Sequence, residues 1–212
     1  MISVLLFIFS AMAQECPRSK IRRVDVIESP KITEASGMIV TDELIWVHND
    51  SGDSPTVYAI DFNGHPLGDA SIDGAFARDW EDASSFQKGG ERYFILGDIG
   101  DNKERKSFTE FYVIKEPGLL GNIPLLYSFT AEYEVGSKDA EAMFVDPRTN
   151  ELIILTKGRE GIAYWLRGTI PEKKEHITLK KSKSKENARK PTKNEAKQRK
   201  RARPLSGKST SP

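Results

Sequence analysis

The 212-residue chain has a single cysteine, Cys16, and no apolar run as long as the roughly 18 residues that a membrane-spanning helix requires. One cysteine excludes an internal disulfide framework and a cysteine-rich zinc module. The sequence also lacks the Gly-x-Ser-x-Gly elbow, the His-Glu-x-x-His motif and the phosphate-binding Gly-x-x-x-x-Gly-Lys-Ser/Thr loop. Nucleophilic catalysis by a triad is therefore without support.

The first 13 residues have the pattern of a short secretory signal peptide. Ile2 to Ala13 is apolar and ends in Ala11-Met12-Ala13, a small-x-small sequence of the kind that signal peptidases cleave. We therefore expect a secreted or extracellular protein, periplasmic if the source is bacterial. The alternative is that this stretch is a buried first strand or helix. Glu15 excludes Cys16 as a lipoprotein anchor, and a lone thiol in an oxidising compartment favours a missing cysteine partner over a free thiol.

The net charge of +1 averages two unlike parts. Residues 1–167 are acidic, with 17 Lys and Arg against 27 Asp and Glu, whereas residues 168–212 carry 15 Lys and Arg against four Asp and Glu. After Leu179 the chain has almost no aliphatic or aromatic residues, so we expect 168–212 to be a disordered basic tail, appended by a changed reading frame or a retained intron. Residues 198–203 resemble a nuclear-import or nucleic-acid patch, but without aromatic residues any binding would be nonspecific, so nucleic acid is an unlikely partner.

Three segments of the acidic part repeat one pattern of short apolar runs separated by turn residues. Each begins with a glutamate and reaches a second polar position 16 or 17 residues later. The three pairs of positions are Glu34 and Asp50, Glu81 and Asp98, and Glu141 and Lys157.

These repeats predict an all-β fold in which each unit is a four-stranded antiparallel sheet, the form of a propeller blade. Residues 21–167 would then be a partial β-propeller of about three blades, with 21–27 as an extra strand and the third unit ending after its third strand. A β-sandwich is the alternative. Since propellers have about four to eight blades, the ring would be open, and self-association through the exposed edge is expected.

Strand direction in such a meander places the leading glutamates and the loops after each second strand at one mouth of the channel. Many carboxylates there would repel one another unless a cation is bound, and oxygen ligands favour Ca²⁺ or Mg²⁺ over zinc. His48 would add a nitrogen ligand or accept a proton. The competing interpretation is that these residues make turns and bind counter-charges such as Arg78 and Lys157. The expected metal ligands are Glu34, Asp50, Asp53, Glu81, Asp98, Asp101 and Glu141.

Four acidic motifs stand out along residues 30–166. They are Trp46-Val47-His48-Asn49-Asp50-Ser51-Gly52-Asp53, Asp79-Trp80-Glu81-Asp82, Gly97-Asp98-Ile99-Gly100-Asp101-Asn102 and Asp139-Ala140-Glu141-Ala142. By these motifs the sequence resembles a group of exported β-propeller proteins, mostly of unknown function. It is more distantly similar to gluconolactonase-type six-bladed propellers, in which a Ca²⁺ or related ion sits at the channel mouth, and this resemblance implies that Glu34 is a metal ligand.

The sequence therefore favours a secreted propeller module that binds a divalent cation and an unknown small molecule or extracellular ligand. The first alternative is a metal-assisted hydrolase of lactone or phosphoester type, in which Glu34 and the Asp loops hold the ion and His48 moves protons. The second alternative is a protein that associates with nucleic acid through its basic tail.

Overall fold

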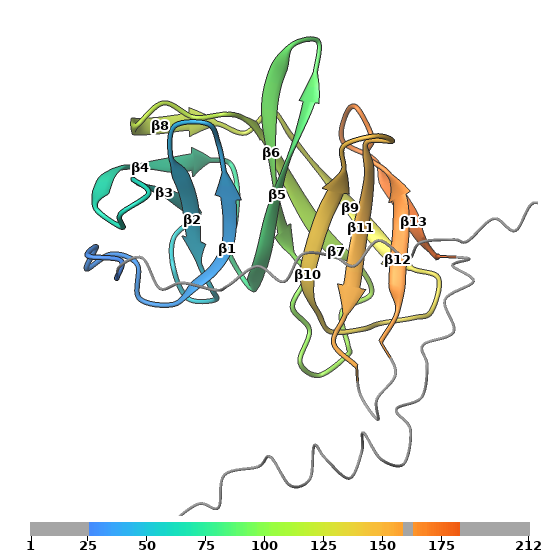
Figure 1. The fold of residues 1–212 in the computed structure, drawn as a ribbon. Helices are drawn as coiled ribbons and strands as arrows, with labels where there is room; N and C mark the ends of the chain where they lie inside the picture. Colours follow the sequence, from blue (N-terminus) through green and yellow to red (C-terminus); the bar gives the residue numbers. More distant parts are fainter. Residues whose placement is uncertain (1–25, 159–162, 183–212) are drawn as a thin grey trace, which may run out of the picture.

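The computed structural model describes residues 26–158 and 163–182. These residues form thirteen β-strands and no helix, which confirms the all-β prediction (Figure 1). The expected signal peptide, Cys16 and the basic patch at 198–203 lie outside the described residues. Of the strand expected over 21–27, only Val26 and Ile27 are described, and neither belongs to a strand.

The first repeat is a four-stranded antiparallel meander, here called meander 1, and it lies at the left of Figure 1. A fifth strand, which the sequence patterns did not predict, pairs in parallel with the last strand of the meander. The strands of this five-stranded sheet are β1 (Ala35–Val40), β2 (Ile45–Asn49), β3 (Thr56–Ile60), β4 (Pro66–Asp73) and β8 (Leu120–Pro124).

The second and third repeats are also antiparallel meanders, but they share one eight-stranded sheet. Meander 2 consists of β5 (Trp80–Lys88), β6 (Glu91–Asp98), β7 (Thr109–Lys115) and β9 (Tyr127–Tyr133). Meander 3 consists of β10 (Ala140–Asp146), β11 (Glu151–Thr156), β12 (Trp165–Thr169) and β13 (His176–Lys181). The last strands of the two meanders, β9 and β13, pair in parallel.

The two ends of the eight-stranded sheet, β5 and β10, also lie against each other. The amide of Met143 donates to Asp82 Oδ2 at 2.7 Å, and the amide of Val145 donates to Ser84 Oγ at 3.0 Å. The sheet is therefore nearly closed, like a barrel.

The pairing of β9 with β13 differs from the arrangement in a propeller, where the outer strands of neighbouring blades diverge. The three meanders are thus present, but a partial propeller is not confirmed.

The end of the third repeat corrects one expectation. The tail was expected to begin at residue 168, but β12 continues to Thr169 and β13 supplies the fourth strand of the meander. Leu179 of β13 is completely buried. Ile177 and Leu179 alternate with polar residues as a strand requires, and the surrounding lysines concealed this short pattern. Residues 183–212 lie outside the described part of the chain.

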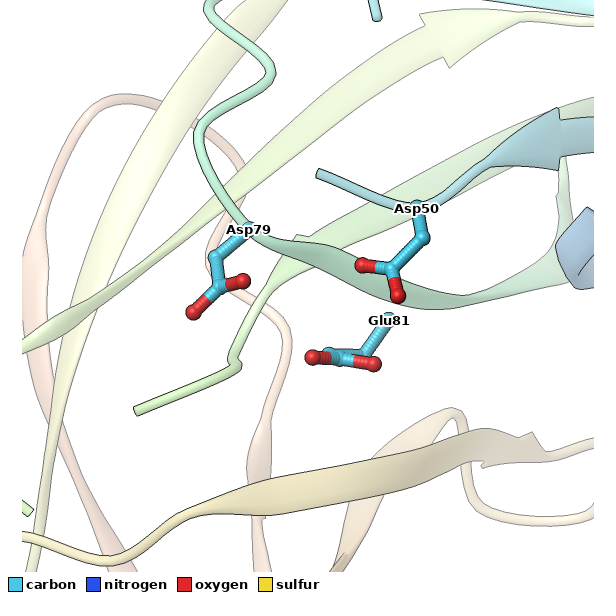
Figure 2. Close-up of side chains that lie close together, drawn as sticks. All are labelled: Asp50, Asp79 and Glu81. Carbon is cyan, nitrogen blue, oxygen red and sulfur yellow. The ribbon is translucent and has the colours of Figure 1, made fainter. Parts of the chain in front are cut away.

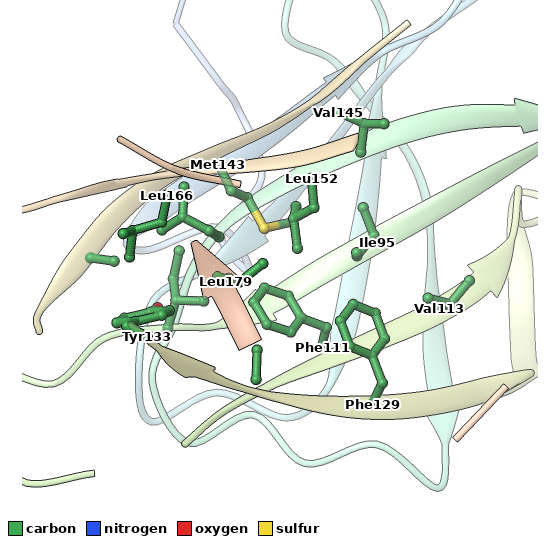
Figure 3. Packing of buried hydrophobic residues seen from close by; sticks show 14 residues of the cluster. Ile95, Phe111, Val113, Phe129, Tyr133, Met143, Val145, Leu152, Leu166 and Leu179 are labelled. Carbon is green, nitrogen blue, oxygen red and sulfur yellow. The ribbon is translucent and has the colours of Figure 1, made fainter. Parts of the chain in front are cut away.

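Two hydrophobic clusters hold the meanders together, and meander 2 contributes to both. Along β6, Phe94 and Leu96 face the cluster shared with meander 1, while Ile95 faces the cluster shared with meander 3. Both faces of this sheet are therefore buried, which explains the continuous apolar run of β6. Figure 3 shows the second cluster, in which Phe111 and Phe129 stack with ring centroids 4.8 Å apart.

Candidate metal centre

Three carboxylates converge where meanders 1 and 2 meet. Asp50 follows β2, Asp79 precedes β5 and Glu81 is the second residue of β5. Each offers one oxygen that lies within 4.8 Å of the oxygens of the other two. Figure 2 shows the three side chains close together. Glu81 is only 7% exposed, and the two aspartates are half-buried.

A β-bulge places Glu81 at this position. Trp80 pairs with Asp98 and Asp82 pairs with Gly97, so Glu81 is an extra residue in β5. Bulges change the direction of a side chain and are common beside functional sites. The first strand of every meander has such an irregularity near its start, between Ala35 and Met38 in β1 and at Glu141 in β10.

The strand register also changes how the three repeats align. The first residue pairs of the three meanders are Ala35 with Asn49, Trp80 with Asp98, and Ala140 with Thr156. By this register Glu34 corresponds to Asp79 and Asp139, whereas Glu81 and Glu141 occupy the bulges. The strand register therefore does not equate Glu34 with Glu81 and Glu141, because the paired first residues lie 14, 18 and 16 residues apart in the three meanders, so equal spacing does not mark equivalent positions. Glu34 is exposed and does not belong to the cluster of three carboxylates.

The electrostatics of the cluster favour either a proton or a cation. Burial raises the pKa of Glu81 to about 8, and the nearby charges of Asp50, Glu141, Asp79 and Asp139 add to this effect. Burial also raises the pKa of Asp79, against the opposing effect of Lys106, whose Nζ lies 3.7 Å from Asp79 Oδ2. Among the described residues, burial and neighbouring carboxylates are the main influences on the pKa of Glu81, and a hydrogen bond to its carboxylate is not one of them.

Gly100 explains how the carboxylates approach the neighbouring loop so closely. A Cβ atom at this position would lie 2.4 Å from Glu81 Oε1 and 2.6 Å from the Asp79 carboxylate. The amide of Gly100 also donates to the carbonyl of Asp79 at 3.3 Å. The glycine therefore leaves the space in which these two side chains lie, and it belongs to the motif at 97–102 that the sequence analysis singled out.

Asp53, another predicted ligand, is hydrogen-bonded within its own loop. Its carboxylate accepts hydrogen bonds from Asn49 Nδ2 at 2.6 Å, from the hydroxyl of Tyr58 at 2.7 Å and from the amide of Ser54 at 2.7 Å. Burial opposes ionisation, but the bonds from Tyr58 and Asn49 outweigh it and lower the pKa. Asp53 thus holds the loop between β2 and β3, as an Asx turn residue does.

Asp98 and Asp101 are buried and bind groups of the loop that follows β6. Lys106 donates to Asp98 Oδ1 at 2.9 Å, and its amide donates to Asp101 Oδ2 at 2.8 Å. The sequence analysis did not identify Lys106, because nothing in the local pattern distinguishes it from the other basic residues of that loop.

The carboxylates of meander 3 are paired with Lys157, a counter-charge that the alternative interpretation had named. Lys157 Nζ lies 3.4 Å from Asp139 Oδ2 and donates a hydrogen bond to Glu141. Asp139 also accepts a hydrogen bond from the amide of Asp101 at 2.7 Å.

The seven predicted ligands therefore divide into two groups. Asp50 and Glu81 meet, with Asp79 as the third member of the cluster, while the other five lie outside it.

His48 is part of the packed interior, with 1% of its surface exposed. Its Nδ1 donates to the carbonyl of Asn49 at 2.7 Å, and its ring meets Trp80 edge-on at 5.5 Å. Burial lowers its pKa, so the ring is neutral. A Cβ at residue 37 would lie 2.1 Å from Nε2, so Gly37 is required for this packing. A role in proton transfer stays a prediction.

A groove of about 570 Å³ lies at the opposite end of the strands, between the β1–β2 turn, the β5–β6 hairpin and the segment after β7. Arg92 in its wall pairs with Asp42 and Glu116. None of the three clustered carboxylates lines it. The groove and the acidic cluster are therefore separate features.

The comparisons with known proteins do not assign this chain to a family. No protein-family model matches this sequence, and no curated protein matches it. No helix long and apolar enough to cross a membrane occurs in 26–158 or 163–182.

Proposed function

We propose that the chain is a cation-binding module in which Asp50, Asp79 and Glu81 hold one divalent ion. The observation that carries this proposal is the convergence of three carboxylates within 4.8 Å, one of them nearly buried. Three ionised carboxylates at this separation repel one another strongly, and a divalent ion removes that cost. The space beside Gly100 supports the same arrangement.

The donor set favours Ca²⁺ or Mg²⁺. All three side chains offer oxygen, and hard cations prefer carboxylate, carbonyl and water oxygens, whereas zinc prefers sulfur and imidazole nitrogen. His48, which belongs to the same sequence motif as Asp50, is held in the core by its hydrogen bond to the carbonyl of Asn49 and by its ring contact with Trp80. We therefore place no nitrogen ligand in the proposed site.

We further propose that this module is exported and forms part of a β-propeller, with a small molecule or an extracellular component as its ligand. The apolar segment at 2–13 and the resemblance to exported propeller proteins support this reading. The succession of three antiparallel meanders is consistent with it. The hydrolase alternative has less support, since His48, the residue that would move protons in it, is only 1% exposed.

Thermal unfolding of the purified chain in EDTA and in excess Ca²⁺, Mg²⁺ or Zn²⁺ tests the cation site. At 100 times the Kd, the ion adds about 2.7 kcal/mol, which raises the Tm by roughly 5–10 °C. We expect this rise with Ca²⁺ or Mg²⁺ and its loss in Glu81→Gln and Asp50→Asn.

Glu34→Gln is the matched control, because Glu34 is an exposed carboxylate outside the cluster. It should keep the full response. Loss of the response in Glu34→Gln but not in Glu81→Gln would place the ion where the family resemblance puts it and overturn the present assignment. No Tm change with any of the three ions would refute cation binding. Turnover of a panel of lactones and phosphoesters that disappears in Glu81→Gln would favour the hydrolase.

A further inference from the structure

The groove between the β1–β2 turn, the β5–β6 hairpin and the segment after β7 has the dimensions of a small-molecule site. Its volume of about 570 Å³ falls within the range of about 300–1,000 Å³ that such sites occupy. Meander 1 contributes Asp42, Glu43 and Leu44 to its lining, and meander 2 contributes Arg92 and Glu116. A molecule bound in the groove therefore contacts both meanders at the boundary between them.

Trp46, which lines the groove, carries an indole N–H without an acceptor. The side chain is only 2% exposed, because it belongs to the cluster shared by meanders 1 and 2. Trp46 Nε1 is buried and has no hydrogen-bond partner among the described residues. A buried donor without a partner is unfavourable and uncommon in proteins. Since the groove is the open space beside this side chain, an oxygen atom of a ligand is a suitable acceptor.

The charged side chains that line the groove are mostly acidic. Four carboxylates and one guanidinium group give them a net formal charge of −3, and they are Asp42, Glu43, Glu91, Glu116 and Arg92. Arg92 pairs with Asp42 at 3.0 Å and with Glu116 at 3.4 Å. Lys115, which is not part of the lining, pairs with Glu91 at 2.9 Å. Two negative charges therefore remain in excess, and they attract a cation and repel an anion.

Apolar groups complete the lining of the groove. Leu44 is half-buried, Leu119 is 43% exposed, and Pro117 lies between the two acidic and apolar parts of the segment after β7. Contact with these side chains favours a ligand that has an apolar part to remove from water. The lining therefore combines an excess of carboxylates, one unpaired N–H donor and an apolar surface.

We propose that this groove binds a small ammonium compound that carries a hydroxyl group on an apolar frame. The ammonium group lies among the carboxylates, and the hydroxyl oxygen accepts the indole N–H of Trp46. A bare metal ion offers no acceptor to this N–H, and an anion is repelled by the carboxylates. The site is separate from the proposed cation site, because Asp50, Asp79 and Glu81 do not line the groove.

Calorimetric titration with three related compounds tests the proposal. Tyramine has an ammonium group and a hydroxyl on an aromatic ring, phenethylamine lacks the hydroxyl, and 4-ethylphenol lacks the ammonium group. We expect tyramine to bind about tenfold more tightly than either analogue, because each analogue loses one of the two polar interactions. Equal affinity for tyramine and either analogue, or no binding of tyramine, would overturn the proposal.

Variants with one carboxylate removed show where the amine binds. Glu43→Gln should weaken tyramine about threefold and leave 4-ethylphenol unchanged, as expected for a partly exposed charge pair. Glu34→Gln is the matched control, since Glu34 precedes β1 and lies outside the groove, whereas Glu43 follows β1. Tyramine binding that is lost in Glu81→Gln and retained in Glu43→Gln would place the amine at the three clustered carboxylates and contradict the proposal.

The indole N–H of Trp46 can be observed directly in the wild type. The chain has three tryptophans, so a ¹⁵N-labelled sample gives three indole signals. Contacts with Phe94 identify the Trp46 signal, because the two rings meet edge-on with centroids 6.1 Å apart. Tyramine should move this signal downfield, as a new hydrogen bond does, and phenethylamine should move it less. A Trp46 signal that saturating tyramine leaves unchanged would refute the hydrogen bond.

Discussion

At the scale of single residues, the environment of each acidic side chain decides what it does. Asp53 and Asp98 are surrounded by donors and hold loops, whereas Glu81 has other carboxylates around it. The same residue types therefore serve as turn residues in one place and as potential metal ligands in another.

The raised pKa of Glu81 makes the stability of the cation-free chain depend on pH. The folded state keeps this proton up to about pH 8, whereas an unfolded chain releases it near the ordinary value of 4.5. Between these values the folded state binds more protons, so the free energy of unfolding falls as pH rises. The Glu81→Gln variant has no ionisable group at this position, so it lacks this contribution to the pH dependence.

In EDTA, Glu81→Gln should therefore gain stability relative to the wild type as pH rises from 5 to 8, by at most about 1.4 kcal/mol for each pH unit. Urea unfolding at several pH values measures the difference between the two proteins, which removes the contribution of the other titrating groups. A difference that does not change with pH would show that Glu81 ionises normally.

Gly100→Ala should weaken cation binding without preventing folding. The added Cβ falls against the carboxylates of Glu81 and Asp79, and overpacking of this kind costs about 1–3 kcal/mol. Calorimetric titration with Ca²⁺ should show at least a tenfold weaker Kd. Gly118→Ala is the matched control, since a Cβ there meets nothing within 4 Å. Equal affinities in the two variants would contradict the role of Gly100.

At the scale of elements, hydrophobic alternation identified the strands that lie within the three repeats, and it failed for two others. β8 contains Gly121 and Pro124 and has no alternating pattern, so its place depends on parallel pairing with β4. β13 is short and rich in lysine, and its position depends on β9 and β12. Both strands are defined by distant partners more than by their own residues.

The importance of β13 can be tested at Leu179. This side chain is fully buried against the second cluster, and Leu→Ala changes at such sites cost about 2–5 kcal/mol. Leu179→Ala should therefore lower the urea midpoint markedly. Lys180→Ala, at the adjacent exposed position, should change it by less than about 0.5 kcal/mol. Similar effects of the two changes would mean that β13 does not contribute to the core.

At the scale of the whole molecule, the arrangement depends on two contacts that join distant parts of the chain. β13 pairs with β9, and β10 lies against β5, so the shared sheet nearly closes. Ser84 contributes to this closure by accepting the amide of Val145. The closure explains why meanders 2 and 3 share a single core in place of two separate blades.

Ser84→Ala should loosen this closure. The amide of Val145 then loses its acceptor, and a buried amide without one costs about 1–3 kcal/mol. Hydrogen exchange should show faster exchange at Val145 together with a lower urea midpoint. Ser85→Ala, at the next position of β5, is the control and should leave both values near those of the wild type. Unchanged exchange at Val145 in Ser84→Ala would rule out this contribution.

The sequence by itself determined the all-β class, the three meanders and the gathering of acidic residues near strand ends, because alternation and turn residues act over a few neighbours. Only the tertiary structure decided which carboxylates meet. The bulge at Glu81, the space at Gly100 and the pairing of Asp139 and Glu141 with Lys157 separate three convergent side chains from the rest. Each of these features lies within one meander, but Asp50 follows β2 of meander 1 whereas Asp79 and Glu81 belong to the start of meander 2. No local pattern encodes the distance between the two meanders.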